Sequence, residues 1–154
     1  MHYTVHPWLS NHGGRQLDGA PSAAETLLEI RQYCPEVFSS CEVIVDGGIT
    51  RGADVVKALA LGAKGVAVGR SFLYALALGD EGLDKAIQIL KQEVEATMGL
   101  VGVTSVAELR PSHVSLEFGR GVLTMKSIKV ANIRLFQVDA HGLLLAGPIA
   151  RARL

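Results

Sequence analysis

A histidine and an arginine stand three residues apart near the start of the chain, within the run SNHGGRQLD at residues 10–18. The imidazole of His12 can accept a proton, and the planar guanidinium of Arg15 can hold a carboxylate through paired, charge-assisted hydrogen bonds. Together they predict a site that removes a proton next to a carboxylate. The plainer alternative is a solvent-exposed loop whose histidine has no chemical role.

Two turns that carry glycine and arginine follow apolar, β-branched runs farther along the chain. Residues 46–52 (DGGITRG) follow the run EVIV, and Gly69 and Arg70 follow the run GVAV. At each turn a strand should end and a helix begin, and the first N–H groups of a helix have no acceptor within it. Such a pair of turns predicts a phosphate site, with Arg51 and Arg70 to neutralise the charge. The alternative is that the glycines only close the loops.

These residues need a scaffold, and the chain between residues 20 and 118 alternates β-branched runs with helical patterns, as βα units do. Capping boxes are predicted at Ser22 with Glu25 and at Ser105 with Glu108. The predicted strands cover 42–45 and 65–68, and the predicted helices begin at Ser22, cover 52–61, follow Arg70 as a long amphipathic helix, and run briefly from Ser105 until Pro111. A strand should also lead into residue 10, but Pro7 argues against a central strand there.

Five segments resemble the FMN-dependent 2-hydroxy acid oxidase and dehydrogenase family, which includes glycolate oxidase, lactate oxidase and the flavocytochrome L-lactate dehydrogenases. They are residues 10–18, 46–48, 57–63, 69–70 and 100–109. The resemblance covers residues 9 to about 114. It implies an α/β fold, a partial TIM (β/α)8 barrel that holds roughly the last three βα units. It also implies FMN as cofactor and the oxidation of a small 2-hydroxy acid, of the glycolate or L-lactate class, to the 2-oxo acid.

The resemblance implies a role for each site residue. His12 matches the base that takes a proton from the substrate, and Arg15 matches the arginine that holds the substrate carboxylate. The implied FMN contacts are Asp46, Gly47, Gly48, Thr50, Arg51, Gly69 and Arg70. Thr50 stands where many relatives have arginine, which removes one cationic contact. The family's flavin-ring contacts, and the carboxylate that pairs with the catalytic histidine, belong to strands that this sequence does not contain.

Residues 119–154 hold apolar runs without a clear period, so we expect a domain over residues 1–118 and an irregular, unassigned tail, in which short strands are possible but have no defined position. Three units of an eight-stranded barrel leave open strand edges and an uncovered apolar face. The alternative to an active oxidoreductase is therefore a truncated, non-catalytic barrel fragment that binds FMN or phosphate weakly. Other phosphate-site barrels, such as diphosphate isomerases and nucleotide dehydrogenases, share the glycine turns but not His12 with Arg15.

Composition excludes several classes of protein. With 49% apolar and 19% charged residues, the chain is typical of a soluble globular domain. Residues 1–118 carry nine Lys and Arg against fourteen Asp and Glu, and the tail carries six against one without a basic, aromatic stripe, so nucleic-acid binding is not expected. No apolar run could span a membrane, and no Walker or G-x-G-x-x-G motif occurs. Cys34 and Cys41 lack the spacing of a metal site and read as reduced thiols.

The expected partners are a small 2-hydroxy carboxylate substrate and, as in the family, other copies of the chain in a homo-oligomer. We expect an intracellular protein. The final residues Ala152, Arg153 and Leu154 resemble the Ser-Lys-Leu class of peroxisomal targeting signal. The alternative is a chance match, because the tail is rich in these three residues. A cytoplasmic or mitochondrial location stays open at this point.

Overall fold

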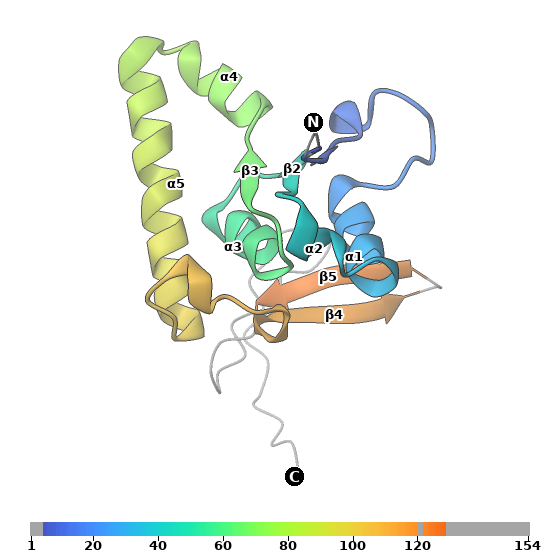
Figure 1. Ribbon diagram of the computed structural model, residues 1–154. Coiled ribbons are helices and arrows are strands. Elements are labelled where there is room, and N and C mark those ends of the chain that lie inside the picture. Colours follow the sequence, from blue (N-terminus) through green and yellow to red (C-terminus); the bar gives the residue numbers. More distant parts are fainter. Residues whose placement is uncertain (1–4, 120–121, 129–154) are drawn as a thin grey trace.

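The computed structural model describes residues 5–119 and 122–128, and a parallel sheet of three short strands forms its centre (Figure 1). In spatial and chain order the strands are β1 (Trp8–Leu9), β2 (Ile44–Asp46) and β3 (Gly65–Ala67). Val45 lies opposite Val66 in the register of the two longer strands. The predicted α/β class with βα units is thus confirmed at the level of a parallel sheet, and the strand positions agree with the sequence patterns to within two residues.

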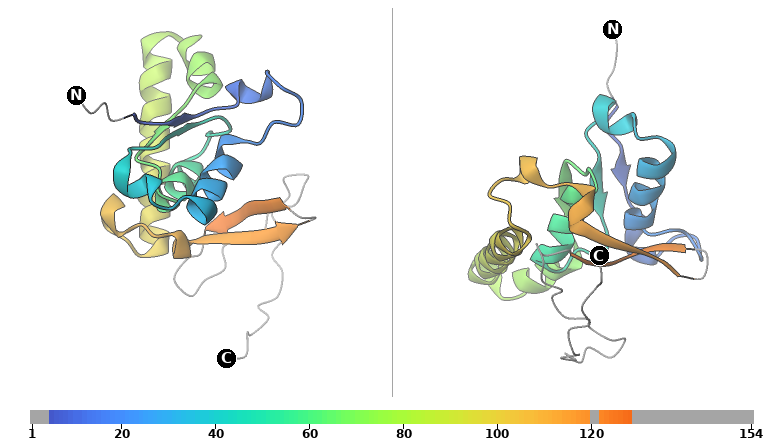
Figure 2. Two further views of the ribbon diagram at one scale, coloured as in Figure 1. Left: turned by 45° about the vertical axis from the view of Figure 1, so that its right-hand side comes forward. Right: turned by 90° about the horizontal axis from the view of Figure 1, so that it is seen from below.

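Helices connect the strands and cover the sheet. They are α1 (Ala23–Tyr33), α2 (Val37–Ser40), α3 (Gly52–Ala60), α4 (Arg70–Leu76) and α5 (Gly79–Val101), with single 3-10 turns η1 (His12–Gly14), η2 (Val106–Glu108) and η3 (Pro111–His113). The helices α1 and α2 come between β1 and β2, α3 comes between β2 and β3, and α4 and α5 follow β3. Figure 2 shows the long helix α5 running beside α3 and α4, with which it is in contact.

The capping box predicted at the start of α1 is present. The Ser22 hydroxyl accepts from the backbone N–H of Glu25 at 3.2 Å, and the Glu25 carboxylate accepts from the backbone N–H of Ser22 at 2.7 Å. The Ser22 hydroxyl also donates to that carboxylate at 2.8 Å. Donation by the Ser22 backbone and then by its hydroxyl lowers the pKa of Glu25 below its ordinary value. Residue types three positions apart therefore fix this helix boundary.

The core lies where α1, β2 and α3 meet. Leu27 of α1 and Val45 of β2 are almost completely buried, and Leu61 at the end of α3 is completely buried. The remaining members of this core cluster are Ala23, Leu28, Val43, Ala58, Ala60, Ala63 and Val114. By contrast, Val101 is the one buried residue of α5, so most of that long helix lies outside the core.

Two glycines allow helices to approach closely. A Cβ on Gly52, the first residue of α3, would collide with the α5 backbone at Glu93 and Val94. A Cβ on Gly82 in α5 would collide with the Ala75 carbonyl oxygen of α4. The start of α3 therefore packs directly against the middle of α5.

The chain after α5 contains a β-hairpin that the sequence patterns did not indicate. The antiparallel strands β4 (Val114–Gly119) and β5 (Val122–Ile128) pair with an irregularity between Ser115 and Leu116. The expectation of an irregular tail is thus wrong for residues 122–128, and the hairpin crosses the expected boundary at residue 118. Alternating apolar residues at 114, 116 and 118 were the available signal for β4.

A second expectation also differs from the structure. Residues near Ser105 form only the 3-10 turn η2, and the Ser105 hydroxyl donates to the Glu108 carboxylate at 2.7 Å instead of capping a backbone N–H. The Thr104 hydroxyl donates to the same carboxylate at 2.9 Å. Since Pro111 follows so closely, no α-helix develops here.

The strand before residue 10 is short and lies at the edge of the described sheet. β1 has two residues and pairs with β2, and the Pro7 carbonyl accepts from the Ile44 N–H at 2.9 Å. A proline that offers only its carbonyl suits the start of an edge strand.

Residues 129–154 lie outside the described residues, and with them the predicted address at Ala152, Arg153 and Leu154. Among the helices of the described ranges, none combines the length and apolar character that a membrane crossing requires.

Candidate active site

The loops that follow the three parallel strands meet at the carboxyl end of the sheet, which is the upper end in Figure 1. They are the His12 loop (residues 10–18), the β2–α3 turn (residues 47–51) and the β3–α4 turn (residues 68–69). In open and barrel α/β folds this end of the sheet carries the binding and catalytic groups. All site residues predicted from the sequence lie on these loops or directly beside them.

The backbone of the His12 loop is strained. His12 has φ 56°, a left-handed value that non-glycine residues rarely adopt, and Gly13 and Gly14 follow with φ 65° and 76°. Two side chains hold this conformation: Ser10 Oγ accepts from the His12 N–H, and Asn11 Oδ1 accepts from the Gly14 N–H, both at 3.1 Å. Such strain costs on the order of 1–2 kcal/mol and concentrates at functional sites.

Gln16 contacts the imidazole of His12, a partner that the sequence analysis did not identify. Its amide nitrogen lies 2.9 Å from Nδ1 of His12. When this nitrogen donates, Nδ1 is an acceptor and a neutral ring carries its proton on Nε2. With the amide turned, its oxygen accepts from Nδ1–H, and Nε2 is then free to take a proton. The orientation of the Gln16 amide and the tautomer of His12 are therefore linked. The spacing of four residues between His12 and Gln16 was the sequence signal that could have indicated this contact.

Arg15 lies on the same loop, between Gly14 and Gln16, and its side chain is exposed. Within residues 5–119 and 122–128 no carboxylate lies within ion-pair distance of its guanidinium. Among the described residues, no acid therefore occupies the donor pairs of the fork, which suit a carboxylate.

Arg70, the first residue of α4, reaches from the β3–α4 turn to the His12 loop. Its Nη2 lies 3.1 Å from the position that a Cβ at Gly13 would occupy, and its Cζ and Nε lie within 4 Å of it. Space is open around Gly69 and Gly48, because a Cβ at either residue would meet nothing within 4 Å. The structure thus brings one predicted phosphate turn into contact with the predicted proton-transfer loop.

The β2–α3 turn is arranged differently from the prediction. Its backbone N–H groups were expected to be free for phosphate, but those of Thr50 and Arg51 donate to the Asp54 carboxylate at 3.1 and 3.0 Å. The Gly52 N–H donates to the Glu93 carboxylate at 2.8 Å, and the Arg51 guanidinium lies 3.3 Å from that carboxylate. Carboxylates belong at helix N-termini because they satisfy free N–H groups and oppose the helix dipole. The N–H groups of residues 50–52 are therefore occupied by carboxylates of the chain itself.

Asp46, at the end of β2, is fixed by a neighbouring strand. The indole Nε1 of Trp8 donates to Asp46 Oδ2 at 2.9 Å, which joins the ends of β1 and β2. Gly47 and Gly48 then turn the chain with φ 83° and 75°. A Cβ at Gly47 would meet Asn11 Oδ1 at 3.5 Å, so the DGG turn also lies against the His12 loop.

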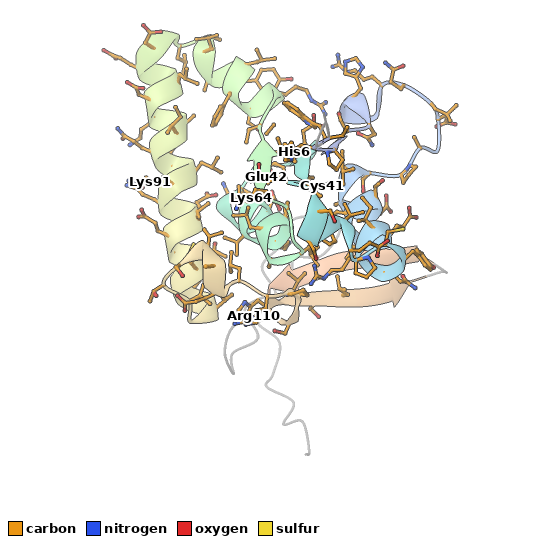
Figure 3. All side chains as sticks on the ribbon, in the orientation of Figure 1. His6, Cys41, Glu42, Lys64, Lys91 and Arg110 are labelled. Carbon is orange, nitrogen blue, oxygen red and sulfur yellow. The ribbon has the colours of Figure 1, made fainter. Side chains whose placement is uncertain are left out.

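Another group of polar side chains lies at the opposite, amino ends of the strands. Figure 3 labels His6, Cys41, Glu42 and Lys64, which border a hollow of about 210 Å³. Here Nδ1 of His6 accepts from the Glu42 N–H at 3.0 Å, which gives this histidine a structural contact. In the described part of the chain, no three His, Cys, Asp or Glu side chains gather closely enough to hold a metal ion.

Comparison with known proteins identifies the family. The family model described as FMN-dependent dehydrogenase matches residues 5–116. The L-lactate dehydrogenase (cytochrome) of Saccharomyces cerevisiae is 47% identical over 137 residues, which cover 87% of this chain and 22% of that enzyme. Glycolate oxidase 3 of Oryza sativa subsp. indica is 46% identical over 113 residues, which cover 73% of this chain and 30% of that enzyme.

Solved structures agree with the sequence matches. A mandelate oxidase variant determined with a monooxide FMN adduct is 44% identical, with a TM-score of 0.63 over 78% of this chain and 34% of that one. The match to the yeast enzyme covers 87% of the chain, which is a longer stretch than residues 1–118. The similarity therefore continues into the tail, where the sequence patterns showed no resemblance. The chain spans about a fifth to a third of the length of these relatives. It belongs to the FMN-dependent dehydrogenase family, whose cofactor is FMN.

Proposed function

We propose that the chain is the carboxyl-terminal part of an FMN-dependent oxidoreductase that converts a small 2-hydroxy acid into the 2-oxo acid. In this proposal β1, β2 and β3 are the last three strands of a (β/α)8 barrel. The observation that carries it is the contact between Arg70 and Gly13, because it joins a phosphate turn to the loop that bears His12 and Arg15. Neither feature alone distinguishes this chemistry from other phosphate-binding barrels.

The roles follow from the chemistry of the side chains. Arg15 holds the substrate carboxylate through a charge-assisted pair, which contributes about 1.5–3 kcal/mol. His12 accepts a proton from the substrate at Nε2 when Nδ1 carries the hydrogen of the ring, and the Gln16 amide, when turned, can accept from that Nδ1–H. FMN, when bound, supplies the acceptor for the hydride equivalent.

The residues present fit the phosphate end of FMN. Arg70 offers an exposed guanidinium that has no carboxylate within ion-pair distance among the described residues. Open space beside Gly48 and Gly69 permits close approach of a ligand to the backbone. Asp46 and Gly47 would contact the ribityl chain, as the family resemblance implies. The backbone N–H groups of Thr50 and Arg51 donate to Asp54, and the Arg51 guanidinium is paired with Glu93. Arg70 is therefore the principal cation for the phosphate.

Relatives guide the substrate class and the location in the cell. The named relatives include a lactate dehydrogenase and a glycolate oxidase, and both act on short 2-hydroxy carboxylates by name. A relative from Arabidopsis thaliana, 46% identical, is named a peroxisomal (S)-2-hydroxyacid oxidase. We assign this chain to the same substrate class, to a homo-oligomer and, by its likeness to the Arabidopsis relative, to the peroxisome. Co-localisation of a fluorescent fusion of the whole protein with a peroxisomal marker tests the location.

A second candidate function is a non-catalytic barrel piece that binds phosphate or FMN weakly. Within the described sheet, β1 and β3 each pair on one side only. The residues Leu73, Tyr74 and Leu78, on α4 and the turn after it, are between 65% and 78% exposed. Open strand edges and exposed apolar groups of this kind require a covering partner. A chain that binds the dye ANS strongly and stays colourless with FMN would favour this candidate.

The first experiment compares the binding of FMN and riboflavin to the chain by quenching of flavin fluorescence. The phosphate site predicts that FMN binds more tightly, and that Arg70→Gln removes the difference. Lys64→Gln, at the opposite end of the strands, is the control and should preserve it. Equal affinity for FMN and riboflavin in the unaltered chain would overturn the proposed cofactor site.

The second experiment tests chemistry in the flavin-loaded chain under anaerobic conditions. If the chain carries the activity by itself, addition of L-lactate or glycolate should bleach the flavin absorbance, and an unchanged absorbance would favour the non-catalytic fragment. His12→Gln should stop this reduction while FMN stays bound, and Arg15→Met should raise the substrate concentration for half-maximal reduction rate about tenfold or more. Loss of FMN from the His12 variant would instead make that residue structural.

A further inference from the structure

The contact between Arg70 and the His12 loop is close and specific to one glycine. Three guanidinium atoms of Arg70, Nη2, Cζ and Nε, lie 3.1, 3.6 and 3.9 Å from a Cβ position at Gly13. The next residue, Gly14, has the same left-handed backbone, yet a Cβ there would meet nothing within 4 Å. The guanidinium therefore lies where a side chain at Gly13 would point, and not where one at Gly14 would point.

We propose that Arg70 is a positioning residue that links occupation of the phosphate site to the conformation of the His12 loop. The inference rests on the proposed function, because it takes the β3–α4 turn as the place where the phosphate binds. It goes beyond that function in one respect: Arg70, which binds the phosphate, also contacts the backbone at Gly13, next to the proposed base His12.

The His12 loop is well suited to respond to such a contact. The turn η1 contains no buried residue, so packing in a core does not fix it. Its strained backbone depends on the hydrogen bonds that its N–H groups donate to the side chains of Ser10 and Asn11, and on the groups that lie against it. A phosphate that holds the guanidinium in its position beside Gly13 strengthens one of these few contacts. Elements with few buried contacts are the ones that small energetic changes displace.

Arg70 can respond to an anion for a related reason. Its side chain is exposed, and among the described residues no carboxylate lies within 4 Å of it. An arginine already paired with an acid, as Arg51 is with Glu93, would have to break that pair first. A phosphate placed at the β3–α4 turn can therefore bind the fork at little cost and hold it against the Gly13 backbone.

The two adjacent glycines provide a matched pair of variants. Gly13→Ala and Gly14→Ala both force alanine into a left-handed backbone and carry a similar strain. Only Gly13→Ala introduces a methyl group where the Arg70 guanidinium lies. Displacement of the guanidinium should weaken the binding of inorganic phosphate about fivefold, while Gly14→Ala should leave it nearly unchanged. In an Arg70→Gln background the two alanine variants should bind phosphate equally.

The experiment titrates inorganic phosphate into the isotopically labelled full chain and follows backbone amide signals by NMR. In the unaltered chain, phosphate should shift the amides of residues 12–14, and Arg70→Gln should abolish this shift. The proposal is overturned if phosphate binds but Gly13→Ala and Gly14→Ala have equal affinities, or if the loop amides do not move. If phosphate does not bind the unaltered chain at all, the proposed phosphate site fails together with the inference. The two failures are therefore distinguishable.

Discussion

Replacement of Glu93 by alanine should destabilise the chain far more than the same replacement at Glu95, two residues away on α5. One oxygen of Glu93 accepts the Gly52 N–H at 2.8 Å, and the other lies 3.3 Å from the Arg51 guanidinium. Glu95 pairs with Lys91 at 3.9 Å, and both of these side chains are mostly exposed. The two variants share residue type, helix and change in helix propensity, so their difference isolates the contact with α3.

The magnitude follows from burial. A hydrogen bond to a charged group contributes about 1.5–3 kcal/mol, and the buried Gly52 would lose the acceptor of its N–H. The Arg51 side chain is 72% exposed, so its ion pair adds at most about 1 kcal/mol. We therefore expect a loss of about 2–3 kcal/mol for Glu93→Ala and less than about 0.5 kcal/mol for Glu95→Ala.

Urea unfolding followed by circular dichroism measures both free energies of unfolding at constant ionic strength. Glu93→Gln keeps one acceptor oxygen for Gly52 but loses the charge, so its free energy of unfolding should fall between those of the unaltered chain and Glu93→Ala. Equal unfolding midpoints for the two alanine variants, with equal denaturant slopes, would refute the view that Glu93 fixes the start of α3.

Three further predictions concern other parts of the molecule. Because the pKa of Glu25 is lowered in the fold, its contribution should be complete above the ordinary glutamate pKa of about 4.3 and should disappear as the pH falls through the folded value; Glu25→Gln should therefore cost stability at pH 7 and none in strong acid, and a constant cost across this range would contradict the assignment. Gly52→Ala should destabilise the chain by about 2 kcal/mol or more in thermal unfolding because the methyl group meets the α5 backbone, whereas Gly99→Ala, with open space inside α5, should stabilise it by up to about 1 kcal/mol. In ¹⁵N NMR of the imidazole, Gln16→Leu should change the tautomer ratio of His12, and an unchanged ratio would remove Gln16 as the residue that sets it.

Local sequence patterns predicted the elements that depend on nearby residues. Ser22 and Glu25 form their capping box because the partners lie three residues apart. The helix expected over residues 52–61 is observed over 52–60, since its boundary glycines act locally. The β-branched runs predicted two of the three sheet strands to within two residues. The motif spacing was also enough to identify the family, because its loops carry residue types that few other barrels combine.

The site needed the tertiary structure, because its decisive contacts join residues far apart in the chain. Trp8 binds Asp46 across 38 positions, and Gly52 binds Glu93 across 41. No periodicity or propensity reports such pairs, since they arise from how helices and strands pack. The sequence therefore determined which loops carry the chemical groups. Only the packing decided that Arg51 is held by an acid of α5 while Arg70 stays available beside Gly13, because the path of the backbone determines which charges meet.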